Sequence, residues 1–129
     1  MQLNNIENRS NQYDIAIDSG AELQIQAAID SPDDVRIKAD DGSLVDAPIT
    51  AGNVRAADDV KIKARGNIEV AGAVEAFDRI ELSARNDLTL LSQASLTGLD
   101  DGKARFVYLH AGDELNLDGF INAERIVVC

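Results

Sequence analysis

Acidic side chains recur just before a set of short apolar segments, at positions where they could bind a metal ion. Asp33, Asp58 and Asp78 each lie two residues before the first apolar residue of such a segment. If the segments stack as β-strands about 4.8 Å apart, neighbouring carboxylates repel each other by about 0.8 kcal/mol even in water. Calcium, which prefers oxygen ligands, would compensate this repulsion. Alternatively, each Asp accepts hydrogen bonds from backbone N–H groups of its own corner.

Basic side chains form a second candidate site. Arg36 and Lys38 alternate on one apolar segment, and Lys61 and Lys63 take the same positions on the next segment. If the two segments are neighbouring strands, four of the 12 basic residues gather on one face. Their charge-assisted contacts would suit an anionic glycan from a host or matrix. A solvated strand face, on which Lys discourages aggregation, is the alternative interpretation.

Catalytic residues are not recognisable in this sequence. His110 is the only histidine, and no Ser-His-Asp or Cys-His arrangement is visible around it. Paired carboxylates are unavoidable among 23 acidic residues and do not by themselves define a glycosidase. We therefore expect no enzyme activity, and no cofactor unless calcium binds to the aspartates.

The segments that must position these residues form a repeat of about twenty residues. Apolar and polar residues alternate in each copy, and Gly, Asn and Asp follow it, which is typical of short β-strands joined by tight corners. The copies begin at Tyr13, Asp34, Asp59, Arg79, Phe106 and Arg125. This pattern predicts an all-β fold, a β-solenoid of about five coils of roughly 20 residues each.

The repeat also predicts the domain organisation. Residues 1–12 are polar and are expected to form an irregular N-terminal cap or linker, followed by the β-solenoid at 13–129. The spacing between copies lengthens from 20 residues to 25 and 27 in two coils, which predicts insertions within 44–52 and 97–105. The last coil is expected to be incomplete and uncapped. Its open edge would pair with another copy or with a flanking coil of a longer chain.

Composition limits the partners of this chain of 129 residues. Its 12 Lys and Arg against 23 Asp and Glu give a net charge of −11, which disfavours nucleic acids and anionic membranes. No apolar stretch approaches the roughly twenty residues of a transmembrane helix, and the N-terminus does not resemble a signal peptide. The single cysteine, Cys129, cannot form an internal disulfide. Cysteine usage fits either a cytosolic protein or a bacterial surface protein.

Two stretches, AADDVKIKARGNIEVAGAV at 56–74 and RIELSARNDLTLL at 79–91, resemble the repeats of filamentous-haemagglutinin-type bacterial adhesins. The resemblance covers about residues 13–129 and implies a single-stranded, right-handed parallel β-helix at the cell surface or outside the cell. A second resemblance is to bactofilins, short cytoplasmic β-helices that polymerise end to end. The small size of the chain favours bactofilins, whereas the two insertions and the unfinished coil favour adhesin repeats.

The function expected from the sequence is therefore structural or adhesive and not enzymatic. The chain would be a segment or building block of an extracellular fibre or large surface adhesin, stacking end to end through open coil edges. A bactofilin-like cytoskeletal polymer in the cytoplasm is the alternative. A β-helix that binds glycans or processes polysaccharides is less favoured, because such enzymes use more coils and a groove of clustered catalytic groups.

Overall fold

The structure is a computed structural model that describes only part of the chain. It describes the backbone of residues 2–3, 6–7, 15–19, 23–25, 28–31, 33–39, 49–51, 53–98 and 104–129, and the side chains of 30, 33–38, 54–98 and 104–129. These residues form strands and turns, and none of them is helical.

The strands form three parallel sheets. The first sheet contains β1 (Gln2–Leu3), β4 (Leu23–Ile25), β7 (Ile49–Ala51), β10 (Ile68–Val70), β13 (Leu88–Leu90) and β16 (Leu115–Leu117). The second contains β2 (Ile6–Glu7), β5 (Ala28–Ser31), β8 (Asn53–Ala56), β11 (Ala73–Ala76), β14 (Ser95–Thr97) and β17 (Phe120–Ile121). The third contains β3 (Ile15–Ser19), β6 (Val35–Ala39), β9 (Asp59–Ala64), β12 (Arg79–Ala84), β15 (Ala104–Ala111) and β18 (Ala123–Val128).

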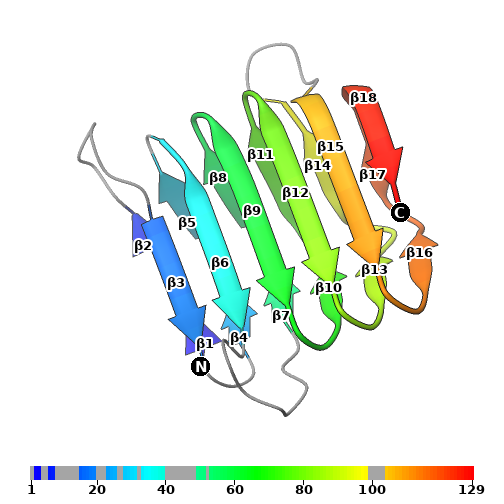
Figure 1. Cartoon of the computed structure of the whole chain (residues 1–129). Helices are drawn as coiled ribbons and strands as arrows, with labels where there is room; N and C mark the ends of the chain where they lie inside the picture. Colours follow the sequence, from blue (N-terminus) through cyan, green and yellow to red (C-terminus); the bar gives the residue numbers. More distant parts are fainter. Residues whose placement is uncertain are drawn as a thin grey trace.

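Each strand pairs with the strand three positions further along the chain, as expected for a β-solenoid. One coil therefore contributes one strand to each sheet, and the coils stack in chain order from β3 to β18 (Figure 1). This arrangement confirms the predicted fold class. Each sheet has six strands, whereas the sequence predicts about five coils.

Part of the first layer lies within the segment that is expected to form an N-terminal cap or linker. Residues 1–12 are not irregular throughout, because β1 and β2 lie within them and pair with β4 and β5. The expected insertions are only partly described. Within 44–52, residues 49–51 form β7, and within 97–105 the described residues belong mainly to the ends of β14 and β15. Residues 40–48 and 99–103 lie outside the described part.

The core is a set of apolar columns between the three sheets. Every second residue of a strand points inward, so β9 shows buried positions at Val60, Ile62 and Ala64 and more exposed ones between them. The parallel register places each buried residue on its equivalent in the next coil, as Ile62 on Leu82. The described columns are fully or almost fully buried from β6 to β15. Burial of each such side chain contributes about 1.5–3 kcal/mol, which makes the coils depend on their neighbours.

The corners between strands are also hydrogen-bonded from coil to coil. Asp78 donates its backbone N–H to the carbonyl of Asp58 at 2.9 Å, and Asn67 accepts the N–H of Asp87 through its side chain at 3.0 Å. Gly112 must be small, because a Cβ atom there would lie 1.8 Å from the carbonyl oxygen of Arg85. The stack therefore remains in register through its corners as well as along its strands.

A cavity in one central column should destabilise the whole stack. We expect Leu82→Ala, at a fully buried position on β12, to lower the free energy of unfolding by about 2–5 kcal/mol. Glu81→Ala on the outward face of the same strand should cost less than about 1 kcal/mol. Urea unfolding followed by circular dichroism would measure both, because the chain contains no Trp. Equal effects of the two substitutions would contradict the assigned inside and outside faces.

Candidate functional site

One corner of the solenoid gathers acidic side chains at the entrance of the third sheet. This aspartate ladder consists of Asp33, Asp34, Asp58, Asp59 and Asp78. The backbone N–H of Asp58 bonds to the carbonyl of Asp33, and that of Asp78 to the carbonyl of Asp58, at 3.0 and 2.9 Å. These two bonds stack the three residues directly on one another. The structure thus brings together the three aspartates that the sequence aligned.

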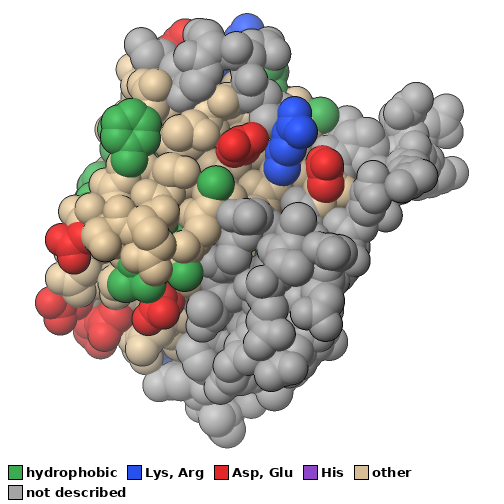
Figure 2. All heavy atoms as spheres, turned by 180° about the vertical axis from the view of Figure 1, so that it is seen from behind, with side chains coloured by type: hydrophobic (Ala, Val, Ile, Leu, Met, Phe, Trp, Pro, Cys, Tyr) green, Lys and Arg blue, Asp and Glu red, His purple; other side chains and the backbone are tan. Residues whose placement is uncertain are grey.

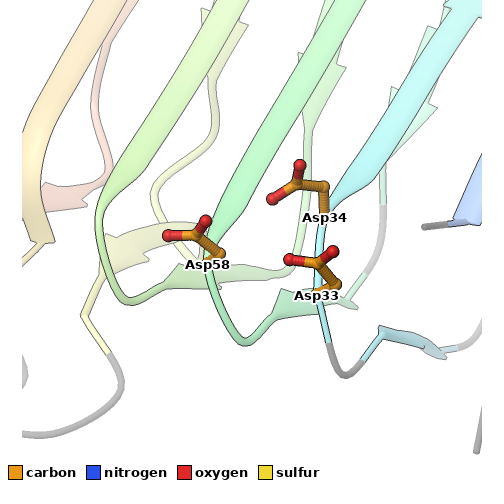
Figure 3. Close-up of side chains that lie close together, drawn as sticks. All are labelled: Asp33, Asp34 and Asp58. Atoms are coloured by element: carbon orange, nitrogen blue, oxygen red, sulfur yellow. The ribbon is translucent and has the colours of Figure 1, made fainter. Parts of the chain in front are cut away.

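The ladder contains two overlapping groups of carboxylates. Oxygen atoms of Asp33, Asp34 and Asp58 all lie within 4.8 Å of one another, and the same is true of Asp58, Asp59 and Asp78. In Figure 3 the side chains of Asp33 and Asp34 extend from the start of β6 toward the next coil, where Asp58 lies. The sequence interpretation missed Asp34 and Asp59. The signal that could have found them is the Asp-Asp pair in each of these two coils.

The two missed aspartates compensate part of the charge repulsion. The Asp34 carboxylate accepts the backbone N–H of Asp59 at 3.1 Å, and the Asp59 carboxylate accepts the N–H of Arg79 at 3.2 Å. The carboxylates that accept these bonds belong to Asp34 and Asp59, which directly follow Asp33 and Asp58 in the sequence. Each N–H donor lies in the next coil and not in the corner of the accepting aspartate. Arg36 adds an ion pair to Asp34 at 3.6 Å, which is weak because its side chain is largely exposed.

Burial and the remaining repulsion raise the pKa of two carboxyl groups of the ladder. Burial, followed by the negative charges of Asp34 and Asp78, raises the pKa of Asp58. Burial and the same neighbouring charges, with that of Asp58, raise the pKa of Asp59, although the hydrogen bond from Arg79 opposes this shift. Protons therefore bind more tightly to these two groups in the folded chain than in the unfolded chain. The stability that this provides is complete below the ordinary Asp pKa and is lost as the pH rises through the raised values.

Chemically, the ladder offers carboxylate oxygens to a hard cation. Calcium takes six to eight oxygen ligands at about 2.3–2.6 Å, and each group of three aspartates supplies one ligand atom per residue. Carbonyl groups and water would have to complete the coordination. The calcium site at Asp33, Asp58 and Asp78 stays a prediction.

Removal of the shared carboxylate should reveal the repulsion. We expect Asp58→Asn to raise the Tm near pH 7 and to leave it nearly unchanged near pH 3, where the aspartates of the unfolded chain are also protonated. Calorimetric scans at both pH values, with Glu69→Gln on the exposed face of β10 as control, would measure the difference. If calcium binds, added CaCl₂ raises the Tm of the unsubstituted chain more than that of Asp58→Asn. A lower Tm of Asp58→Asn near pH 7, without calcium, would contradict the assigned repulsion.

The basic residues also lie together as the sequence predicts. The register places Arg36 beside Lys61 and Lys38 beside Lys63 on the adjacent strands β6 and β9. Glu81 follows in the first of these columns and Ser83 in the second, so the basic patch ends at β12. The position of the four side chains is confirmed. Glycan binding at this patch stays a prediction.

His110 continues the second basic column on β15, opposite Ser83. Its Nδ1 atom is buried and has no hydrogen-bond partner among the described residues. Among the described residues, two groups of aspartates could bind a metal ion, and His110 belongs to neither of them. The expectation that the chain has no enzyme activity stays a prediction.

From β12 onward, the corner that carries the ladder is mainly basic, with Arg79, Arg105 and Arg125 beside one acidic residue, Glu124. The guanidinium of Arg79 lies 5.5 Å from the ring centre of Phe106, and that of Arg105 lies 5.0 Å from the ring centre of Phe77. A shallow hollow of about 310 Å³ beside these pairs is lined by Arg105, Phe106, Glu124 and Arg125. The cation–π pairs link successive coils where the acidic column ends.

The last described coil exposes residues whose register partners are buried in the preceding coils, wherever the side chains of those partners are described. Leu117 is 41% exposed, Ile126 46% and Val128 49%, whereas their register partners Leu90, Val107 and Leu109 are at most 1% exposed. Phe120, at 61%, is exposed on the neighbouring strand β17. Figure 2 shows apolar side chains at the surface on the side of these last strands. Leu117, Ile126 and Val128 continue columns that are buried in β13 and β15, whereas Phe120 is the register partner of Ser95 and lies on the outward face of its sheet.

The main chain at this end is open as well. β16, β17 and β18 are the terminal strands of the three sheets, so each is paired on one side only. Such an edge presents N–H and C=O groups that can pair with a further strand. We name the surface formed by these strands and by Leu117, Phe120, Ile126 and Val128 the C-terminal end face. It combines apolar side chains with a template for backbone hydrogen bonds.

No protein-family model matches this chain, and no curated protein or solved structure is significantly similar to it. Among the described residues, no helix is long and apolar enough to cross a membrane. The function is therefore inferred from the solenoid itself.

Proposed function

We propose that this chain is a non-enzymatic, structural β-solenoid that forms a rigid segment or building block of an extracellular fibre or large surface adhesin. It extends by docking β-strands on its C-terminal end face. The observation that carries the proposal is the exposure of Leu117, Ile126 and Val128 at positions that are buried one coil earlier. Three strand edges beside them supply the hydrogen-bonding groups of a further coil.

The end face has the character of an internal coil contact and not of a finished surface. Leu117, Ile126 and Val128 are 41–49% exposed, so completing the burial of each would contribute about half of the roughly 1.5–3 kcal/mol that full burial supplies. New backbone pairs would add direction to the contact, because parallel strands pair only in a defined register. A charged or twisted edge would discourage this pairing. β18 carries the charged Glu124 and Arg125 in its first half, and its second half, Ile126, Val127 and Val128, is apolar.

Rigidity is the property that such a segment would supply. The three sheets run through every described coil, and their columns of buried side chains form one continuous core. Bending would have to break hydrogen bonds or open cavities in several sheets together. The resemblance of 56–74 and 79–91 to filamentous-haemagglutinin-type repeats supports a location at the cell surface or outside the cell.

A bactofilin-like polymer in the cytoplasm is the second candidate. The same C-terminal end face favours it, since such a polymer also grows through open coil edges. The two candidates differ in location and in whether the next coil belongs to another chain. Localisation of the tagged chain in the cell of origin would separate them.

A charge placed in the core column of the end face should prevent docking. We expect Ile126→Lys to raise the concentration needed for end-to-end assembly at least about tenfold, because the new charge would be buried without a partner. Val127→Lys is the matched control, with the same charge on the outward column of the same strand. Negative-stain electron microscopy and light scattering over a concentration series would measure assembly of each protein.

The unsubstituted chain should form rods that lengthen with concentration, and Val127→Lys should do the same. Short rods of one length at every concentration, together with an unchanged molar mass, would contradict docking at the end face. Equal loss of assembly in both variants would show that net charge and not the buried column controls it.

A further inference from the structure

The same register relates every pair of neighbouring coils, from the first layer to the last. In the third sheet, one column of register partners begins at Ile15 and ends at Ile126, and the next begins at Ile17 and ends at Val128. In the second sheet a column of register partners runs from Ile6 to Ile121. The first and last residues of these columns are all apolar.

The first sheet follows the same rule. Leu3 pairs with Ile25, and further along the sheet Val70, Leu90 and Leu117 share one column. Its first and last described members are again apolar. The first and last strands of all three sheets therefore carry apolar residues at equivalent register positions.

We infer that the occupant of the C-terminal end face is a second copy of this chain, stacked head to tail by translation along the solenoid axis. Strands β1, β2 and β3 of the second copy then continue the sheets beyond β16, β17 and β18. Leu117 comes to lie opposite Leu3, Ile121 opposite Ile6, Ile126 opposite Ile15, and Val128 opposite Ile17. The stacking of a second copy rests on the proposed end-docking function and names its partner.

Continuity with the contacts inside the chain is the main support for this partner. Each internal contact is parallel and joins a coil to the next without change of register. A head-to-tail junction repeats that contact, and apolar positions meet apolar positions in each of the four columns described above. No insertion or change of strand direction is needed.

The register positions between these columns are also compatible. By the same register, Asn116 comes opposite Gln2 and Val127 opposite Ala16, and an extension by one residue brings Asn122 opposite Glu7 and Cys129 opposite Asp18. No two like-charged residue types meet at these positions, in contrast to the aspartate ladder inside the chain.

A contact between two C-terminal end faces would have a different geometry. The two copies would be related by a two-fold axis, which makes their paired strands antiparallel. Such a pair would close the end face and leave the β1, β2 and β3 edges outside, so its growth would stop at a dimer unless those edges also paired. The direction of stacking is therefore measurable.

Disulfide trapping can test the direction and the register together. The thiol of Cys129 is exposed, and register partners on adjacent strands lie about 4.8 Å apart, within the Cα spacing of a disulfide. The unsubstituted chain, which carries only Cys129, is mixed under mild oxidation with a tagged double variant, Asp18→Cys with Cys129→Ser. Each protein then has one thiol, at opposite ends of the solenoid.

Head-to-tail stacking predicts a mixed disulfide dimer as the main product, separated from both homodimers by the tag on a non-reducing gel. A second pair, Val127→Cys and Ala16→Cys, each with Cys129→Ser, should give the same result at the neighbouring register position. The crossed mixture of Ala16→Cys, Cys129→Ser with the unsubstituted chain is the matched control. Its thiols are shifted by two residues, about 6.6 Å along the strand, so we expect at least about fivefold less mixed dimer.

The outcomes separate the partner from the proposed function. If the homodimer of the unsubstituted chain is the sole disulfide product, head-to-tail stacking is wrong, whereas the proposal that the C-terminal end face docks is retained. Rods without any in-register disulfide, in folded variants checked by circular dichroism, would overturn the register. Monomers in both cross-linking and electron microscopy would overturn the second copy and the end-docking function together.

Discussion

Parallel pairing without change of register is the constraint on which the rest of this structure depends. Each strand hydrogen-bonds to the equivalent strand of the next coil, so equivalent side chains stack at the strand spacing along the whole molecule. Stacking of like on like suits apolar residues, because Ile62 on Leu82 excludes water from both. The core of the solenoid is a direct result of this pairing.

The same pairing stacks residues that repel each other. Asp33, Asp58 and Asp78 are brought together by the backbone bonds of their corner. Burial, together with the charges of Asp34 and Asp78, raises the pKa of Asp58. Hydrogen bonds from the next coil to Asp34 and Asp59 reduce this cost, and Arg79 ends the acidic run. At this corner the backbone register, which stabilises the whole solenoid, is retained although it places like charges next to each other.

In a stack of equivalent coils, an end coil has a neighbouring coil on one side only. Inner residues of β16 and β18 have the sequence of core residues, but they have a covering coil on one side only. The contact that stabilises each internal coil is therefore the contact that the last coil can make with something else. For a solenoid, cohesion within the chain and association between chains use the same hydrogen bonds and the same apolar columns.

The sequence by itself determined the strands of the third sheet, their inward and outward faces, and the alignment of Asp33 with Asp58 and of Arg36 with Lys61. Those features follow from alternation and spacing, which are local properties of the chain. Strands as short as β1 and β2 carry no readable period, so their place in the sheets came only from pairing with β4 and β5. Only the tertiary structure decided that the carboxylate of Asp34 accepts the N–H of Asp59, and that Arg79 lies over Phe106. Such contacts, like the exposure of Ile126 and Val128, depend on which coils lie next to a residue, and that is a property of the stack and not of any one segment.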